Sequence, residues 1–253
     1  GLPASVISGM TQSTDNLIWI TTWNGLSCYD GYRFTTFRNI PGHDSQLTTN
    51  HLISVMPATD GNLWTTAYTD DVYMFDSHKC QYVNVSALIT KKFQSRFSLR
   101  KIYPLANGDT WVVGKYNEHY HMAKGDSDSD RDIRQFTLPG TLNKVVLDGF
   151  GDEWLFCDQG AFVYTEKGNP RQVTRLWVDF VEKVGNTLWL VTVDGKILHM
   201  KRGGKPAEVR LANKVDKVKE VKVIKGRILA LATDRGVLVY DTKTGHDRLL
   251  SVQ

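Results

Sequence analysis

Short stretches of alternating or β-branched hydrophobic residues recur along the whole chain, and turn residues separate them. The first unit shows the order: an apolar segment over 6–10, a strand around Trp19, a turn at 24–25, an alternating strand over 26–30 and a closing segment over 34–37. Short strands at this spacing, joined by Gly, Asn and Asp turns, are typical of an antiparallel β-meander. No amphipathic stretch with a helical period is convincing beyond two turns. The pattern therefore predicts an all-β chain.

The same order of segments repeats six times, at intervals of roughly 42 residues. Four strands in a repeat of this length are typical of one β-propeller blade. A blade is a small sheet, so its large central aromatic can be buried only against the next blade. The predicted inter-blade core positions are Trp19, Trp64, Trp111, Trp154 and Trp189, with Leu229 in place of Trp in the last unit.

We therefore predict one β-propeller of four-stranded antiparallel blades over residues 1–253, with six legible repeats. The chain is expected to be part or all of a six- to seven-bladed propeller. A propeller that lacks its closing strand leaves blade edges unpaired, which predicts dimerisation or poor solubility unless six blades close. The approximate repeats are 5–37, 51–85, 99–137, 144–174, 180–211 and 218–250.

Composition limits the class of protein further. The 253 residues are 41% hydrophobic and 23% charged, which is an ordinary globular composition. The longest uninterrupted apolar run, 228–232, is far too short to span a membrane as a helix. Cys28, Cys80 and Cys157 have no motif spacing, which argues against a disulfide framework and against a zinc site.

The net charge of +4 is unevenly distributed. Residues 196–227 hold eleven Lys and Arg against Glu208, Asp216 and Glu220. Such a stretch can attract nucleic acid or an anionic polymer. The alternative interpretation is a solvated strand face with a loop. We expect no direct nucleic-acid binding, and the stretch would add long-range attraction for an acidic glycan.

No sequence motif indicates catalysis. The chain has no nucleophile elbow, P-loop, dinucleotide fingerprint or zincin helix, and its seven histidines match no known catalytic spacing. The segment His119-Tyr120-His121 could bind a transition metal, and Asp126, Asp128 and Asp130 echo the first ligands of a calcium loop. Arg131 and Thr137 then occupy the places of the required Gly and Glu. We interpret 126–132 as an acidic connector and predict no enzyme activity, metal or cofactor.

The turns that follow the second strand of each blade lie on one face of a meander, together with the links between blades. An aromatic side chain beside amides and carboxylates suits a sugar. The C–H face of the sugar stacks on the aromatic ring, and the hydroxyls of the sugar form hydrogen bonds with the polar groups. The alternative is that these are ordinary polar turn residues. The candidate ligand-binding residues are Trp23, Asn24, Tyr68, Asp70, Tyr116 and Arg235.

The segment 17–31, LIWITTWNGLSCYDG, closely resembles the repeat of the two-component regulator propeller family. The second unit repeats the word as DGNLWTT over 60–66, and the later units keep mainly the turn glycines and the central hydrophobic residues. Thr21 and Thr65 stand where the family often has Gly. The resemblance covers most of the chain, roughly 5–241.

This resemblance implies a ligand-sensing region of a hybrid two-component protein rather than a catalyst. In the family, two seven-bladed propellers precede a β-sandwich, a membrane helix, a histidine kinase and a DNA-binding regulator, in Bacteroidetes. It implies a periplasmic location, recognition of an oligosaccharide, control of a polysaccharide-utilisation response, and a homodimer in the full-length protein. Any membrane contact would come only through further C-terminal segments. Only six units are legible here, so the chain resembles an N-terminal part of such a sensor.

Two other functions stay open. One is a propeller scaffold for protein–protein interaction or dimerisation, and the other is a propeller lyase. A bound oligosaccharide would favour the sensor over the scaffold, and turnover of a glycan would favour the lyase.

Overall fold

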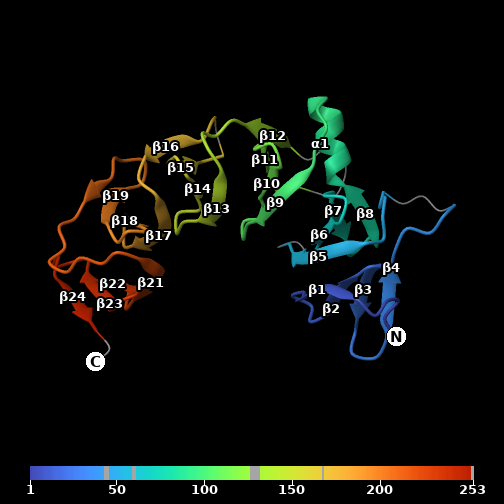
Figure 1. The fold of residues 1–253 in the computed structure, drawn as a ribbon, viewed down its shortest axis with the longest axis horizontal. Helices are drawn as coiled ribbons and strands as arrows, with labels where there is room; N and C mark the ends of the chain where they lie inside the picture. The colour runs from blue at the N-terminus through green and yellow to red at the C-terminus, as the bar shows by residue number, and fades with distance from the viewer. Residues whose placement is uncertain (43–45, 59–60, 126–131, 167, 252–253) are drawn as a thin grey trace. The chain divides into compact units, whose positions relative to one another are not determined.

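The computed structural model describes residues 1–253 except 43–45, 59–60, 126–131, 167 and 252–253. The described residues form six four-stranded antiparallel sheets and the helix α1 (Val85–Phe93) (Figure 1). In each sheet the strands pair in chain order, as in the blades of a propeller. The prediction of an all-β propeller of four-stranded blades is confirmed. The chain divides into two compact units, residues 1–137 and residues 138–253, with three blades each.

The strands are numbered along the chain, four to a blade. Unit 1 holds β1 (Ile7–Gln12), β2 (Ile18–Thr22), β3 (Gly25–Tyr29) and β4 (Phe34–Phe37) in blade 1; β5 (Leu52–Pro57), β6 (Leu63–Ala67), β7 (Val72–Asp76) and β8 (Gln81–Asn84) in blade 2; and β9 (Leu99–Pro104), β10 (Thr110–Gly114), β11 (His119–Met122) and β12 (Ile133–Phe136) in blade 3.

Unit 2 follows the same plan. It holds β13 (Leu142–Leu147), β14 (Glu153–Cys157), β15 (Gly160–Tyr164) and β16 (Arg171–Thr174) in blade 4; β17 (Val178–Val184), β18 (Thr187–Thr192), β19 (Ile197–Lys201) and β20 (Ala207–Glu208) in blade 5; and β21 (Val218–Ile224), β22 (Ile228–Thr233), β23 (Gly236–Asp241) and β24 (Asp247–Leu250) in blade 6.

The glycine that opens the third strand has a steric cause. Gly25 has a φ of 105°, and a Cβ there would lie 2.6 Å from the carbonyl oxygen of Phe37 in β4. Gly160 and Gly236 face the backbone of their own fourth strands in the same way, with φ of 119° and 125°. Only glycine tolerates both this φ and this approach. A glycine at the start of a third strand therefore marks the point where that strand passes close to the backbone of the fourth strand.

The predicted tryptophans are all buried. Trp19 lies in one hydrophobic cluster with residues of blade 2, and Trp64 lies in another with residues of blade 3. In unit 2, Trp154 lies with residues of blade 5 and Trp189 with residues of blade 6. Within each unit, then, the tryptophan of a blade packs against the next blade, as predicted.

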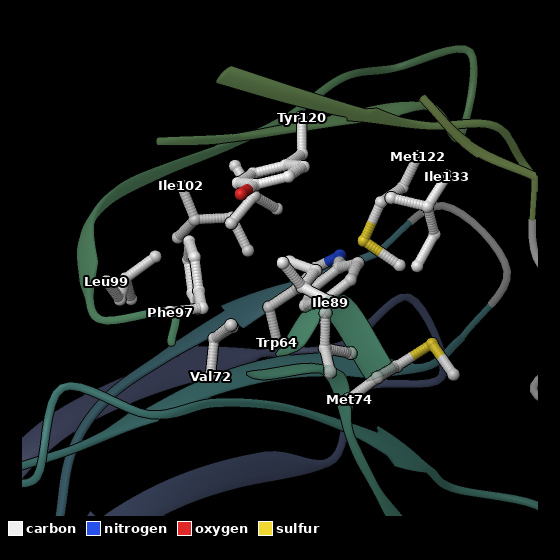
Figure 2. Close-up of a cluster of buried hydrophobic side chains, with 12 residues drawn as sticks. Trp64, Val72, Met74, Ile89, Phe97, Leu99, Ile102, Tyr120, Met122 and Ile133 are labelled. Carbon is white, nitrogen blue, oxygen red and sulfur yellow. The ribbon is translucent and has the colours of Figure 1, made fainter. Parts of the chain in front are cut away.

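Helix α1 fills part of the interface between blades 2 and 3 and was not predicted. Its N-cap Asn84 accepts a hydrogen bond from the backbone N–H of Ala87 at 2.9 Å. Val85 and Ile89 are buried in the cluster that surrounds Trp64. Figure 2 shows Ile89 in this cluster. With nine residues, the helix gives a hydrophobic pattern too short to separate from its neighbouring strands. No helix in the described part of the chain is long and apolar enough to cross a membrane.

The position of Leu229 corrects the prediction for the last unit. The turn before β22 spans 225–227, one residue more than the turn over 185–186 before β18. A shift of one residue places each side chain of a strand on the opposite face of the sheet. Leu229 therefore faces blade 5, where it lies in the hydrophobic cluster of Trp189. Ala230 takes the place that the tryptophan has in the other blades. Leu229 is therefore a core residue, but it does not replace Trp.

Candidate ligand-binding surface

A repeated backbone hydrogen bond assembles the turn surface of each unit. The residue after the second strand donates its N–H to the carbonyl of the residue that precedes the first strand: Tyr68 to His51 at 3.2 Å and Lys115 to Ser98 at 2.9 Å. Turns also bond to the following blade, since the N–H of Leu99 donates to the carbonyl of Asp70 at 2.8 Å. Blades 2 to 5 thus each place two positions on this surface, one in the turn and one before the first strand.

Three rings lie in contact on the surface of unit 1, with Trp23 tilted against His51 and His51 stacked on Tyr68, and we call them the aromatic row. The centroids of Trp23 and His51 are 4.5 Å apart, and those of His51 and Tyr68 are 4.8 Å apart with the planes inclined by 28°. Trp23 is 54% exposed and Tyr68 is 59% exposed, so both present open ring faces to solvent. His51 is half-buried between them. The row therefore joins the turns of blades 1 and 2.

Polar groups continue this surface toward blade 3. Asp70 has a φ of 63°, a conformation that Asp tolerates better than most residues. Its carboxylate forms an ion pair with the ammonium of Lys115 at 2.5 Å and accepts a hydrogen bond from the hydroxyl of Ser98 at 3.4 Å. Tyr116, next to Lys115, is 83% exposed. An ammonium, a carboxylate and a phenol thus lie beyond the row.

Two of the predicted residues have different surroundings. The side-chain amide of Asn24 donates to the carbonyl of Pro3 at 3.4 Å, so it holds the N-terminal segment. Arg235 belongs to unit 2, where its guanidinium donates to the carbonyl of Lys214 at 3.0 Å. The structure therefore brings Trp23, Tyr68, Asp70 and Tyr116 onto one surface of unit 1, and Arg235 lies on the turns of the other unit.

The turn surface of unit 2 carries a charged cavity. It has a volume of about 690 Å³ and is lined by both cations and carboxylates, among them Lys196, Lys214 and Asp194. Trp177, which is 57% exposed, lies just before β17, and its carbonyl accepts the N–H of Val193 at 3.2 Å. Trp177 has the position in blade 5 that His51 has in blade 2.

Sequence reasoning missed His51, Lys115 and Trp177. Lys115 lies in a turn after a second strand, where the neighbouring Tyr116 was chosen instead. His51 and Trp177 precede first strands, and that position was not searched. A signal was present, because His51 directly precedes the apolar residue Leu52 and Trp177 directly precedes the apolar residue Val178. Aligning the repeats on that boundary would have found both.

The other polar segments have structural surroundings. His119 and His121 are buried in β11, and the Nε2 atom of His121 lies 3.4 Å from the carboxylate of Asp109. Neither ring nitrogen of His119 has a hydrogen-bond partner among the described residues. Burial, with a smaller contribution from Arg100, lowers the pKa of His119. The predicted acidic connector lies outside the described residues over 126–131, and Asp132 pairs with Arg134.

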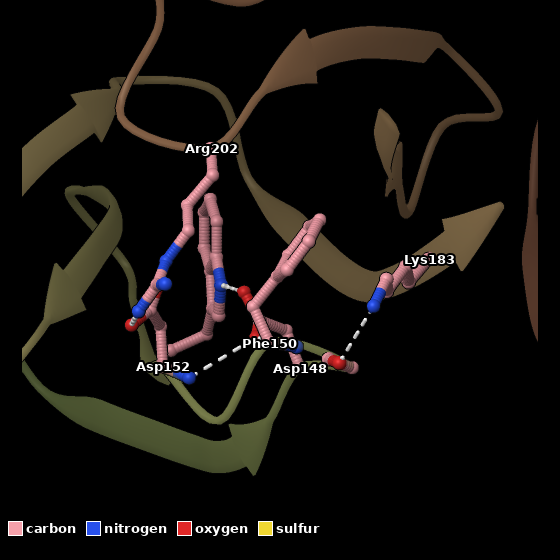
Figure 3. Close-up of polar contacts among 7 residues, drawn as sticks. Asp148, Phe150, Asp152, Lys183 and Arg202 are labelled. Carbon is pink, nitrogen blue, oxygen red and sulfur yellow. Dashed lines mark hydrogen bonds and ion pairs between the residues drawn. The ribbon is translucent and has the colours of Figure 1, made fainter. Parts of the chain in front are cut away.

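The basic stretch 196–227 is partly neutralised by nearby carboxylates. The ion pair with Arg227 holds the pKa of Asp241 well below its usual range. The pairs are Arg202–Asp152 (Figure 3), Lys219–Asp234, Lys222–Glu220 and Arg227–Asp241. Because Asp152, Asp234 and Asp241 lie outside the stretch, its net charge overstates the positive field that a ligand would meet.

No protein-family model matches the sequence, and no curated protein matches it either. Several solved structures have a similar fold. The propeller of Dos1 is 9% identical with a TM-score of 0.58, over 98% of this chain and 72% of that one. Virginiamycin B lyase from Staphylococcus aureus is 17% identical with a TM-score of 0.51, over 98% of this chain and 84% of that one.

The extracellular domain of a hybrid two-component system from B. thetaiotaomicron also has a similar fold. It is 14% identical with a TM-score of 0.50, and the match covers 100% of this chain and 36% of that one. The chain thus spans about a third of that domain. At these identities the likeness shows the fold alone: the chain folds as a β-propeller similar to those of a lyase and of the extracellular domain of a hybrid two-component system.

Proposed function

We propose that this chain is the ligand-binding propeller of an extracytoplasmic sensor of the hybrid two-component kind, and that the aromatic row binds an oligosaccharide. One observation carries the proposal. Trp23 and Tyr68 are exposed on either side of the half-buried His51 ring, and the row is followed by the ion pair of Asp70 with Lys115.

The chemistry of the row suits a sugar. Two exposed ring faces offer stacking surfaces for the C–H faces of pyranose rings, and stacking has little cost when the rings are already fixed against each other. The carboxylate of Asp70, the ammonium of Lys115 and the hydroxyl of Tyr116 offer acceptors and donors for sugar hydroxyls. A ligand of several sugar rings would therefore lie across the turns of blades 1 to 3.

The likeness to a two-component ectodomain supports a sensor, and the sequence resemblance of 17–31 supports the same family. A periplasmic location, control of polysaccharide utilisation and a homodimer of the full-length protein belong to this proposal. The likeness to a lyase concerns the fold, and the aromatic row holds no nucleophile paired with a base. The proposal is therefore one of binding without turnover or nucleic-acid contact.

Calorimetry against a panel of neutral and acidic oligosaccharides tests the proposal. Trp23→Ala and Tyr68→Ala should each weaken binding by about 1–3 kcal/mol, as loss of a stacking anchor does. Tyr32→Ala is the matched control, because Tyr32 is also in unit 1, is 96% exposed and has no ring contact in the row. Binding of an acidic glycan should also weaken as salt rises.

Two results would count against the proposal. If Trp23→Ala and Tyr68→Ala bind every oligosaccharide as the Tyr32→Ala control does, the row is not the site. If a glycan is cleaved during the titration, with products visible by chromatography, the lyase alternative is favoured.

A further inference from the structure

The chain that joins blade 2 to blade 3 carries positive charge without any acidic residue. Residues 77–108 contain no aspartate or glutamate. The link itself, residues 85–98, begins with α1 and ends directly before β9. A segment without carboxylates has no counter-charge of its own, so compensation must come from neighbouring segments or from a bound anion. The cations of 77–108 are Lys79, Lys91, Lys92, Arg96, Arg100 and Lys101.

Hydrogen bonds fix the end of this link on the turn surface of unit 1. The carbonyl of Ser98 accepts the N–H of Lys115 at 2.9 Å, and the hydroxyl of Ser98 donates to the carboxylate of Asp70 at 3.4 Å. The next residue, Leu99, donates its N–H to the carbonyl of Asp70 at 2.8 Å. Arg96 lies only two residues before Ser98. We call Asp70, Arg96, Ser98 and Lys115 the blade 3 corner.

Aromatic packing anchors the link against blade 3. The ring of Phe97 is buried and meets the ring of Tyr120 edge to face, with the centroids 5.5 Å apart (Figure 2). The ring of Phe93, the last residue of α1, lies 5.1 Å from that of Tyr120. The N–H of Phe97 also donates to the hydroxyl of Thr90 at 3.3 Å. The backbone at Arg96 is therefore held in place before a ligand arrives, which lowers the entropy lost on binding.

The cations of the link are less compensated than those of the basic stretch 196–227. In that stretch four cations pair with carboxylates. Lys91, Lys92 and Arg96 are exposed and make no ion pair among the described residues. The two lysines lie in the last turn of α1, where they complement the partial negative charge of the helix end. Arg96 follows the C-cap Gln94, so its charge remains available to a ligand.

The carboxylates around the blade 3 corner are already engaged. Asp70 forms its ion pair with Lys115. Glu118, in the same turn as Lys115, accepts a backbone N–H of that turn at 3.0 Å. Since Asp70 is compensated by Lys115, Glu118 is opposed by Arg96 and by the lysines at the end of α1. The excess charge around the corner is therefore positive, and it attracts an anionic group.

We propose that the ligand of this surface is an acidic oligosaccharide, whose carboxylate or sulfate group binds at Arg96 and Lys115. The inference rests on the proposed binding of an oligosaccharide by the aromatic row, and it names the class of that ligand. Sugar rings lie on Trp23 and Tyr68, and the anionic group lies beyond them at the blade 3 corner. A guanidinium binds such a group through two parallel N–H bonds, which are stronger than bonds to an uncharged hydroxyl.

Two matched pairs of ligands test the proposal by calorimetry on the whole chain. Trigalacturonate is compared with its methyl ester, and a κ-carrageenan tetrasaccharide with its desulfated form. In at least one pair the acidic member should bind about tenfold or more tightly than its uncharged counterpart, and that pair distinguishes a carboxylate from a sulfate.

The outcomes separate this inference from the proposed function. If uncharged members bind as tightly as acidic ones, or if only neutral oligosaccharides bind, the acidic class is wrong and the proposed function stands. If no oligosaccharide of either kind binds, the proposed function fails and the inference fails with it.

Variants locate the anionic group. Arg96→Gln should weaken the acidic member about tenfold and leave its uncharged counterpart unchanged, and Arg96→Glu should weaken the acidic member further. Trp23→Ala should weaken both members alike, because the row contacts sugar rings rather than charge. Arg33→Gln is the matched control, since Arg33 is 81% exposed in the turn between β3 and β4, at the opposite end of its blade from Trp23.

Salt dependence gives a second readout. Binding of the acidic member should weaken as salt rises, and it should weaken less in Arg96→Gln than in the wild type, because one cation of the site is gone. The melting temperature of Arg96→Gln should stay that of the wild type, since Arg96 is exposed. If Arg96→Gln binds the acidic member as Arg33→Gln does, the anionic group does not bind at the blade 3 corner and the proposal is overturned.

Discussion

Blades 1 and 2 in the first unit and blades 4 and 5 in the second bury a tryptophan in the same way. Trp19 and Trp64 lie against the next blade of unit 1, and Trp154 and Trp189 lie against the next blade of unit 2. The tryptophan of a four-stranded blade can be buried only in this way, because only the neighbouring sheet can cover so large a side chain. The core is therefore alike in the two units.

The turn surfaces of the two units differ. In unit 1 the turn residues Trp23 and Tyr68 stack with His51. In unit 2 the corresponding turns begin with Asp158, Val193 and Asp234, and the exposed ring is Trp177 beside a charged cavity. The backbone hydrogen bonds that form the surface are shared, so the side chains there can vary without changing the fold. Binding chemistry is accordingly expected where the repeats differ.

The largest expected effect tests the shared core. Trp64→Ala and Trp154→Ala should each lower the free energy of unfolding by about 3–5 kcal/mol, as truncation of a buried aromatic does. Denaturant unfolding followed by circular dichroism measures both. Trp23→Ala, at an exposed site, should stay within about 0.5 kcal/mol of the wild type. If either core variant behaves like Trp23→Ala, the two units do not share this packing.

The second expected effect tests the register of blade 6. Leu229→Ala should cost about 2–5 kcal/mol, because Leu229 is fully buried against blade 5. Ala230→Ser should cost no more than about 0.5 kcal/mol, because Ala230 is partly exposed and faces the other way. Thermal unfolding of the two variants compares them directly. If Ala230→Ser were more destabilising than Leu229→Ala, Leu229 would occupy the position of the tryptophan after all.

Much of the fold could be predicted from the sequence because it is local and repeated. Turn glycines, short alternating strands and the recurring tryptophan report the blade directly, and five tryptophans were correctly placed in the core. Leu229 was misplaced because one extra turn residue is invisible without the pairing of β21 with β22. Helix α1 was missed because its apolar stripe is only as long as a strand.

The candidate sites were less predictable for a different reason. Trp23, Tyr68 and Asp70 could be chosen because turn residues share a face in any meander. The part played by His51 depends on its distance from two rings in different turns, which only the folded chain fixes. The place of Arg96 near the ion pair of Asp70 and Lys115 likewise depends on tertiary packing, because the sequence separates these residues.

The third expected effect compares two tryptophans within unit 2. The indole N–H of Trp154 donates to the buried carboxylate of Asp148 at 2.8 Å, whereas that of Trp189 is buried without a partner among the described residues. Trp154→Phe removes the hydrogen bond, and Trp189→Phe removes an unsatisfied donor. Trp154→Phe should therefore be more destabilising than Trp189→Phe by about 1–2 kcal/mol in urea unfolding. Equal losses would mean that the bond to Asp148 contributes nothing to stability.

The smallest expected effect is a pH dependence that belongs to unit 1. His119 is fully buried at the start of β11, where blades 4 and 5 have the apolar residues Ala161 and Ile197 at the corresponding register positions. Burial lowers the pKa of His119, so the unfolded chain binds a proton more readily than the folded chain does. By linkage, stability is fully present above the unfolded pKa of about 6.5 and falls as the pH drops below it. Melting temperatures between pH 8 and pH 5 should decline less for His119→Val than for the wild type, and unchanged declines would assign the acid sensitivity to other groups.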